Sequence, residues 1–291
     1  KILLIGEYSR LHNSLKEGLS QLGHDVTLVG DGDGFKNFPV DIKIERGYSK
    51  GLPKKIKNAF YKWFNIDLSS FYLEKQFIKN KRHFVDYDVV QLINERPFMA
   101  TPKTERRLLE YLFEHNTNVF LLSCGTDYLS VKSALNKEFR YSILSPYFDN
   151  KSFEKHYRFI LKYVTTPYQK LHKFLYKNIQ GVIASDLDYH LPLYGNPSYL
   201  GMIQNPINTN KIEYQPLHIS DKLIIFHGIN RMNYIKKGNR FFEEALEIIN
   251  EIWKYRTENN SNICFTLDAG ANVHVLYPED EKQEVNNFIE R

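Results

Sequence analysis

The 291-residue sequence contains only two cysteines and three methionines, and it has no long hydrophobic run. Cys124 and Cys264 lie far apart, which argues against a disulfide framework and favours a reducing compartment such as the cytoplasm. No segment approaches the roughly 18 consecutive apolar residues that a membrane-spanning helix needs. No signal peptide is expected, since Lys1 leads directly into an apolar segment without a small-residue cleavage site. The net charge of +5 is too small to indicate a nucleic-acid partner.

Metal-binding patterns are also missing from the sequence. None of the ten histidines falls into a cluster with ligand spacing. The stretch 31–34, Asp-Gly-Asp-Gly, lacks the glycine and glutamate positions of an EF-hand loop and is interpreted as a turn. Asp186 and Asp188 have the Asp-x-Asp spacing of metal-dependent transferases, but they follow a strand signal and favour a helix cap or a loop. We therefore expect no metal site.

Strand and helix signals alternate from the first residue, and this alternation predicts parallel βαβ units. Gly23 follows a stripe of leucines and is expected at the C′ position of the first helix. The apolar patterns predict strands at 2–5, 24–30, 87–94, 119–123, 182–185 and 263–267, and helices at 11–22 and 103–115.

The most informative stretch is 222–246. Its apolar residues 223–226 predict a buried strand, and a helical apolar stripe begins after residue 239. Between the two lie the glycines and cations of a possible anion site: Gly228, Arg231, Lys237 and Gly238. Free N–H groups and the helix dipole favour anions at such a junction. A phosphate-binding element and a solvated basic turn are both compatible with this pattern.

This stretch resembles the nucleotide-sugar-binding element of retaining glycosyltransferases of the GT-B architecture, in the family 4-like group. Arg231, Lys237 and Gly238 match the spacing in that family, whereas Asn230 stands in place of the usual glycine. The resemblance implies that Arg231 and Lys237 bind the diphosphate of a sugar donor. It also implies that they stabilise the departing nucleoside diphosphate.

The fold that the resemblance implies is α/β, with two Rossmann-like domains that contain parallel sheets. An acceptor-side domain is expected at 1–206 and a nucleotide-sugar-binding domain at 207–291, with a final helix that could pack back on the first domain. Compared with that family, we expect the second domain to be incomplete in this sequence. In the family, two glutamates eight positions apart hold the ribose and the sugar, and no such motif follows residue 267.

The loops that follow strands are the candidate sites, because donors of this family lie in a cleft outside the carboxyl ends of the strands. After the first strand, Gly6 permits close backbone approach, and Arg10 and His12 are acceptor-side candidates; a helix-capping Ser9 is the alternative. Glu95 and Arg96 are also acceptor-side candidates, although a surface ion pair is favoured over catalysis.

The loop after the strand at 119–123 resembles the His-Gly-x-Asp loop of the family. Gly125 and Asp127 match, while Cys124 stands where histidine is frequent. The resemblance places Asp127 in the catalytic site, where it would either accept a hydrogen bond from a hydroxyl group or organise its loop. Cys124 is not expected to be a nucleophile. The implied donor-binding residues are Gly6, Gly125, Asn205, Gly228 and Gly238.

The segment 50–82 is basic and aromatic, with Asp67 and Glu74 as its two acidic residues. The favoured interpretation is a helix pair that packs its aromatic residues into the first domain and leaves its lysines in solvent. The alternative is a segment that lies on an anionic membrane surface.

The leading functional expectation is a metal-independent glycosyltransferase of the hexosyltransferase type, without a cofactor beyond its nucleotide-sugar substrate. It would transfer sugar to a saccharide or lipid-linked acceptor in bacterial surface polysaccharide synthesis, in the cytoplasm or at the inner face of the membrane. The alternative is a non-catalytic GT-B homologue that acts as a binding or membrane-associated module. A nucleic-acid binder is not favoured, since no recognised motif is present.

Overall fold

The computed structural model describes residues 1–48, 50–64, 66–139, 142–213, 239–267 and 273–289, without the side chains of 239–245 and 274. The chain divides into two compact units. The first consists of Lys1–Ser133 and Phe159–Gln215, and the second of Ala134–Arg158 and Pro216–Arg291. The expected strand at 223–226 lies outside the described residues, as do Gly228, Arg231, Lys237 and Gly238.

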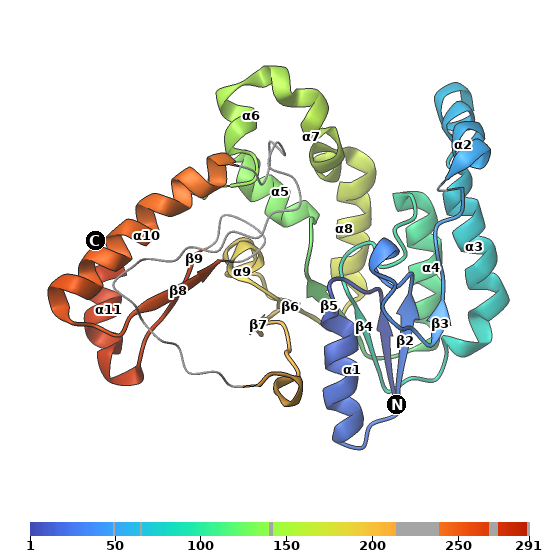
Figure 1. Ribbon diagram of the computed structural model, residues 1–291. Coiled ribbons are helices and arrows are strands. Elements are labelled where there is room, and N and C mark those ends of the chain that lie inside the picture. Colours follow the sequence, from blue (N-terminus) through green and yellow to red (C-terminus); the bar gives the residue numbers. More distant parts are fainter. Residues whose placement is uncertain (49, 65, 140–141, 214–238, 268–272, 290–291) are drawn as a thin grey trace. The chain divides into compact units, whose positions relative to one another are not determined.

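The first unit contains a parallel sheet of seven strands in the order β3-β2-β1-β4-β5-β6-β7 (Figure 1). This order is that of a doubly wound, Rossmann-like α/β fold. The strands are β1 (Ile2–Ile5), β2 (Val26–Gly30), β3 (Ile42–Lys43), β4 (Val89–Leu92), β5 (Val119–Ser123), β6 (Gly181–Ala184) and β7 (Tyr199–Met202).

Helices cover both faces of this sheet. Those in and around the first unit are α1 (Leu11–Gln21), α2 (Gly51–Phe64), α3 (Leu68–Asn80), α4 (Pro102–His115), α5 (Tyr128–Leu135), α8 (Thr166–Asn178) and α9 (Leu187–Leu193). Leu3 and Ile5 of β1 belong to one core cluster with side chains of α3, α4 and α8, whereas Leu4 packs with α1. Because both faces of the central strands are buried, β1, β5 and β6 are almost continuously apolar, as the sequence predicts.

The predicted strands and helices of the first unit are confirmed to within two residues at each end. Gly23 follows α1 with φ +87°, and its N–H donates to the carbonyl of Ser20 at 3.0 Å. The predicted C′ glycine is therefore confirmed. Asp186 accepts the N–H of Leu187 at the start of α9, as the helix-cap interpretation requires.

The second unit contains α6 (Ser145–Asp149), most of α7 (Glu154–Leu161), α10 (Asn239–Asn259), β8 (Cys264–Leu267), β9 (Val273–Leu276) and α11 (Lys282–Ile289). The predicted strand at 263–267 is confirmed, but β8 and β9 pair antiparallel. For this pair, the expected parallel arrangement is wrong. Only residues 268–272 separate the two strands in sequence, which is too short for a parallel crossover.

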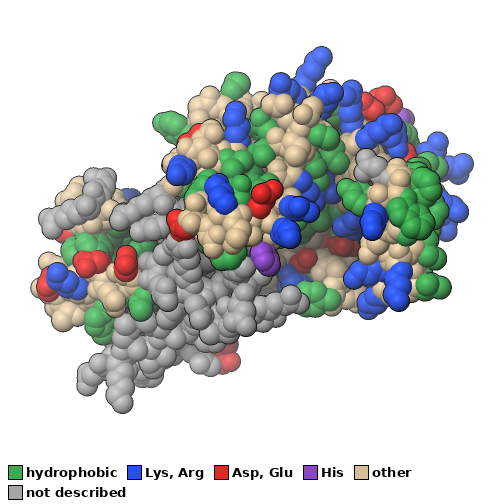
Figure 2. Space-filling model, turned by 90° about the horizontal axis from the view of Figure 1, so that it is seen from above, with side chains coloured by type: hydrophobic (Ala, Val, Ile, Leu, Met, Phe, Trp, Pro, Cys, Tyr) green, Lys and Arg blue, Asp and Glu red, His purple; other side chains and the backbone are tan. Residues whose placement is uncertain are grey.

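The two helices of the basic, aromatic segment differ in burial. α3 buries Leu73 and Phe77 in the core, as the favoured interpretation predicts. α2, all of whose residues are described, has no buried side chain, so that interpretation is wrong for α2. In Figure 2, hydrophobic side chains gather among Lys and Arg at the right of the view, the side on which Figure 1 shows α2. Within the described residues, no helix is both long enough and apolar enough to cross a membrane.

The first testable position is Gly6, which has φ +92° and whose added Cβ would meet Cγ2 of Ile93 at 2.1 Å. We expect Gly6→Ala to destabilise the protein by more than about 2 kcal/mol, from backbone strain and the clash. Gly18→Ala is the matched control, since this exposed glycine of α1 has open space around it. It should stabilise by about 0.5–1 kcal/mol. Urea denaturation measures both, and a neutral Gly6→Ala would contradict the expected strain.

Candidate functional site

The candidate site lies at the carboxyl ends of β1 and β4. From β1 the chain runs outward to β2 and β3, and then returns to form β4 on the other side of β1. After β1 and after β4 the chain therefore continues in opposite directions along the sheet, which makes this a topological switch point, where ligands of doubly wound folds bind.

Glu7, which follows Gly6 at the end of β1, binds the first turn of helix α1 with its side chain. Its Oε2 accepts the backbone N–H of Asn13 at 2.8 Å and the side-chain amide of Asn13 at 2.6 Å. Glu7 is 2% exposed, and burial raises the pKa of its carboxyl group. Its other oxygen, Oε1, is buried without a hydrogen-bond partner among the described residues. A carboxylate of the protein thus lies where the first turn of α1 offers its N–H groups.

The residues between Glu7 and α1 hold the loop in a left-handed conformation, with φ 49° at Ser9 and 70° at Arg10. The N–H of Ser9 donates to Asp33, and Arg10 donates to Glu17 at 2.6 Å. The N-cap residue of α1 is Arg10, so the alternative in which Ser9 caps this helix is wrong. Arg10 is engaged by a carboxylate of α1, and nothing in its contacts supports an acceptor-binding role.

His12 is completely buried, unlike the acceptor-side residue that the sequence suggests. Its Nδ1 lies 2.7 Å from the carbonyl oxygen of Gly6, and its Nε2 has no partner within the described part of the chain. Burial lowers the pKa of His12 to about 4. The ring is therefore a neutral part of the interior, and it cannot contact an acceptor in this structure.

Tyr8 joins the two loops across the switch point. Asn94, which follows β4, donates its side-chain N–H to the Tyr8 hydroxyl at 2.9 Å, and this hydroxyl lies 3.1 Å from the sulfur of Met99. A Cβ added at Gly125 would lie in ordinary contact with the Tyr8 ring, at 3.6 Å. The loops after β1, β4 and β5 thus meet around one aromatic side chain.

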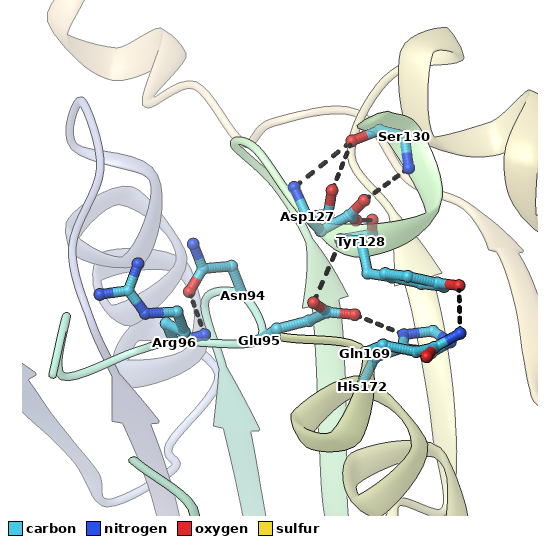
Figure 3. Close-up of polar contacts among 9 residues, drawn as sticks. Asn94, Glu95, Arg96, Asp127, Tyr128, Ser130, Gln169 and His172 are labelled. Atoms are coloured by element: carbon cyan, nitrogen blue, oxygen red, sulfur yellow. Dashed lines mark hydrogen bonds and ion pairs between the residues drawn. The ribbon is translucent and has the colours of Figure 1, made fainter. Parts of the chain in front are cut away.

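Glu95 and Arg96 point in different directions from the loop after β4 (Figure 3). They are 3% and 5% exposed, so the surface ion pair expected for them is wrong. Arg96 donates to the carbonyl oxygens of Met99 and Ala100, and its guanidinium lies 5.2 Å from the ring centre of Tyr168. A buried guanidinium that satisfies carbonyl groups is a structural element of the loop.

Glu105 of α4 holds the same loop from the other side. Its two carboxyl oxygens accept the N–H groups of Phe98 and Ala100, at 2.8 and 2.7 Å. Burial raises the pKa of Glu105 to about 7, although the positive charge of Arg96 opposes this shift. Together, Arg96 and Glu105 fix the backbone of 98–100 with buried polar groups.

Glu95 binds His172 of α8 (Figure 3). Its Oε1 lies 2.6 Å from Nδ1 of His172, and its Oε2 accepts the N–H of Tyr128 at 3.2 Å. Burial raises the pKa of Glu95, although the hydrogen bond from His172 opposes this shift. The imidazole lies between the rings of Tyr128 and Tyr176, at 4.6 and 4.2 Å between centroids. This arrangement fixes the ring, and with Nδ1 as the donor, Nε2 is the basic nitrogen.

Asp127 organises the loop after β5. Its Oδ2 accepts the hydroxyl of Ser123 at 2.5 Å, and its Oδ1 accepts the N–H of Ser130 at 2.7 Å. These contacts support the interpretation of Asp127 as the organiser of its loop. Burial raises the pKa of the neighbouring Cys124 thiol to about 11, which disfavours the thiolate that a nucleophile requires. Gly125 between them has φ +74°.

The structure brings Gly6, Glu95, Gly125 and Asp127 to one edge of the sheet, whereas Asn205 is exposed after β7. Sequence reasoning missed Glu7, Glu105 and His172. Glu7 could have been noticed because an acidic residue directly follows the β1 glycine. Among the described residues, no group of three or more His, Cys, Asp or Glu side chains is placed to hold a metal ion.

No model of a known protein family matches the chain, and no curated protein matches it. Among solved structures, the chain is similar to the 3-alpha-hydroxysteroid dehydrogenase from Pseudomonas sp. B-0831 complexed with NADH, with 13% sequence identity and a TM-score of 0.31. The match covers 63% of this chain and 71% of that chain. A likeness at this level carries no argument about function.

The Glu95–His172 pair predicts a pH-dependent cost of mutation. His172→Leu leaves a buried carboxyl group without its donor, which costs about 3 kcal/mol when that group is ionised. The decrease in the free energy of unfolding should therefore be larger at pH 8 than at pH 5, where Glu95 can take up a proton. His190→Leu is the control, because Nδ1 of His190 lies 2.6 Å from the neutral hydroxyl of Tyr199. Urea denaturation at both pH values that gives parallel profiles for the two variants would contradict this account.

Glu105 predicts a second pH effect. Its pKa in the folded protein is about 7, above the ordinary value of 4.5, so the folded state binds the proton more tightly than the unfolded state does. Glu105 therefore contributes fully to the free energy of unfolding below pH 4.5. This contribution is lost as the pH rises to 7, and the loss is at most about 3 kcal/mol. Glu105→Gln, which cannot ionise, should lack this decrease. Glu110→Gln on the same helix, with a side chain 40% exposed, should retain it.

Proposed function

We propose that the chain is a retaining glycosyltransferase that moves a sugar from a nucleoside-diphosphate donor to a hydroxyl group of a saccharide or lipid-linked acceptor, without a metal ion. In this proposal 1–206 is the acceptor-side domain and 207–291 the nucleotide-sugar-binding domain of a GT-B architecture. The doubly wound sheet of the first unit supports it. The basic strand–helix pattern at 222–246 supports it as well.

The observation that carries the proposal is the position of Glu7. A dinucleotide bound to a Rossmann fold places its pyrophosphate at the N-terminus of the first helix, on a turn with three glycines. Here the carboxyl group of Glu7 takes that position, and Tyr8 and Leu11 stand where the second and third glycines would be. A phosphate next to Glu7 would meet an acidic group in place of free N–H donors. This favours a phosphate site elsewhere in the chain, and Arg231 and Lys237 carry the charge it needs.

The proposed reaction breaks the bond between the anomeric carbon and the diphosphate oxygen. The acceptor oxygen forms its bond to that carbon on the face from which the diphosphate departs, so the configuration is retained. The hydroxyl proton passes to the departing diphosphate, whose added negative charge Arg231 and Lys237 stabilise. Neither an oxidant nor a metal ion is consumed in this scheme.

In the proposal, the first unit supplies a rigid frame for this chemistry. Asp127 fixes the loop that contains Gly125, and Glu95 together with His172 holds α8 against the loops after β4 and β5. Because His172 is half-buried and already bound to Glu95, it serves to position these loops and takes no proton from the acceptor. Asn205 is assigned to the donor side by resemblance only.

A non-catalytic homologue that binds a partner or a membrane is the alternative. The exposed apolar side chains of α2 support it. The two functions differ in whether the chain recognises nucleoside diphosphates at all.

The test measures transfer and donor hydrolysis with uridine-, guanosine- and adenosine-diphosphate sugars. Arg231→Ala and Lys237→Ala should each lower the rate by about 10²–10³, which is typical for the loss of one electrostatic donor. Lys173→Ala, on the exposed side of α8, is the matched control and should leave the rate unchanged. Unchanged rates in both variants would exclude the proposed site. Absence of a thermal shift with all three diphosphates would favour the non-catalytic homologue.

A further inference from the structure

α2 presents its entire apolar face to solvent. Five side chains, spaced three or four residues apart or adjacent in sequence, form this face: Leu52, Ile56, Phe60, Trp63 and Phe64. At about 3.6 residues per turn, this spacing places them on one side of the helix. Their exposed fractions lie between 39% for Phe60 and 74% for Trp63. Exposed aromatic groups at this density mark an interaction surface.

The charged side chains of α2 are all basic. They are Lys54, Lys55, Lys57 and Lys62, which lie beside and opposite the apolar face; Lys50 directly precedes the helix, and 50–64 contains no acidic residue. The two acidic residues of the segment 50–82 already have partners in α3 and α4. Asp67 caps α3 through Ser69 and Ser70, and Glu74 binds Arg107. The lysines of α2 are therefore not neutralised by this part of the chain.

We propose that α2 is a docking helix that lies on the surface of an anionic lipid bilayer. Its apolar face would enter the boundary between headgroups and acyl chains, while its lysines remain at the level of the anionic headgroups. With 14 residues, the helix is about 21 Å long, shorter than the hydrocarbon layer of about 30 Å, so it lies on the bilayer and does not span it. Aromatic side chains such as Trp63 are the ones that favour this interface.

The charge of α2 selects a lipid surface over a protein groove. A helix that enters a protein groove is recognised through its apolar anchors, and its cations contribute only where the groove is acidic. Four lysines without a single acidic residue instead complement a surface of uniform negative charge. Docking by α2 does not depend on the proposed transferase activity, and its test measures no catalysis.

The test is co-sedimentation of the full chain with vesicles of phosphatidylcholine, with and without phosphatidylglycerol, at low and at high salt. We expect binding to the anionic vesicles that weakens at high salt. Phe60→Ser/Trp63→Ser/Phe64→Ser should weaken it about a hundredfold or more through lost apolar contact. Lys54→Glu/Lys55→Glu/Lys62→Glu should have a similar effect through charge reversal. Since these side chains are exposed, the variants should keep the circular dichroism and thermal stability of the parent chain.

Two matched controls test whether binding depends on α2 or on any exposed aromatic or basic side chain. Phe35→Ser removes an aromatic side chain that is 89% exposed outside α2. Lys173→Glu/Lys177→Glu reverses two exposed charges on α8. Both controls should sediment like the parent chain.

Tryptophan fluorescence tests directly whether Trp63 enters the bilayer surface. The chain has two tryptophans, so Trp253→Phe leaves Trp63 as the sole indole. Its emission should shift to the blue when anionic vesicles are added. Absence of sedimentation with anionic vesicles, equal sedimentation with neutral ones, or unchanged binding of the α2 variants would each overturn the proposal. Self-association that requires α2 without vesicle binding would also overturn it, in favour of a second copy of the chain.

Discussion

The contact between Gly6 and Ile93 is the constraint on which the candidate site depends. It allows the backbone after β1 to approach the end of β4 so closely that a Cβ would not fit. The two loops then leave the sheet in contact, and Tyr8 can reach Asn94 and Met99. A larger residue at position 6 would separate the loops and remove the packing that shapes the switch point.

Buried carboxyl groups support this region in a repeated way. Glu7 binds the first turn of α1, Glu95 binds α8 through His172, and Glu105 holds the loop after β4. In each case burial raises the pKa, and N–H donors partly offset the cost of removing the group from water. These three buried acids are therefore used to hold the loops and helices around the switch point.

The fold of the first unit could be predicted from sequence because parallel strands buried on both faces are continuous apolar runs, and Gly23 and Asp186 mark helix ends locally. The antiparallel β8–β9 pair was not predicted, although its connection is too short for the crossover that a parallel pair needs. His172 was not, because 77 positions separate it from Glu95 and no local pattern relates the two. The exposure of α2 was not predictable either. An amphipathic pattern is the same whether the apolar face meets a core or faces solvent, and only the opposing surface decides.

The two left-handed residues after β1 have a consequence for how ligands could bind. Ser9 and Arg10 both occupy a conformation that costs about 1–3 kcal/mol for residues other than glycine. They keep it because Asp33 accepts the N–H of Ser9, Glu17 binds the side chain of Arg10, and Glu7 accepts the N–H of Asn13 in the helix that follows. These contacts hold the loop in one conformation, so it presents a preorganised surface. A ligand that contacts it would lose little affinity to the conformational entropy of this segment.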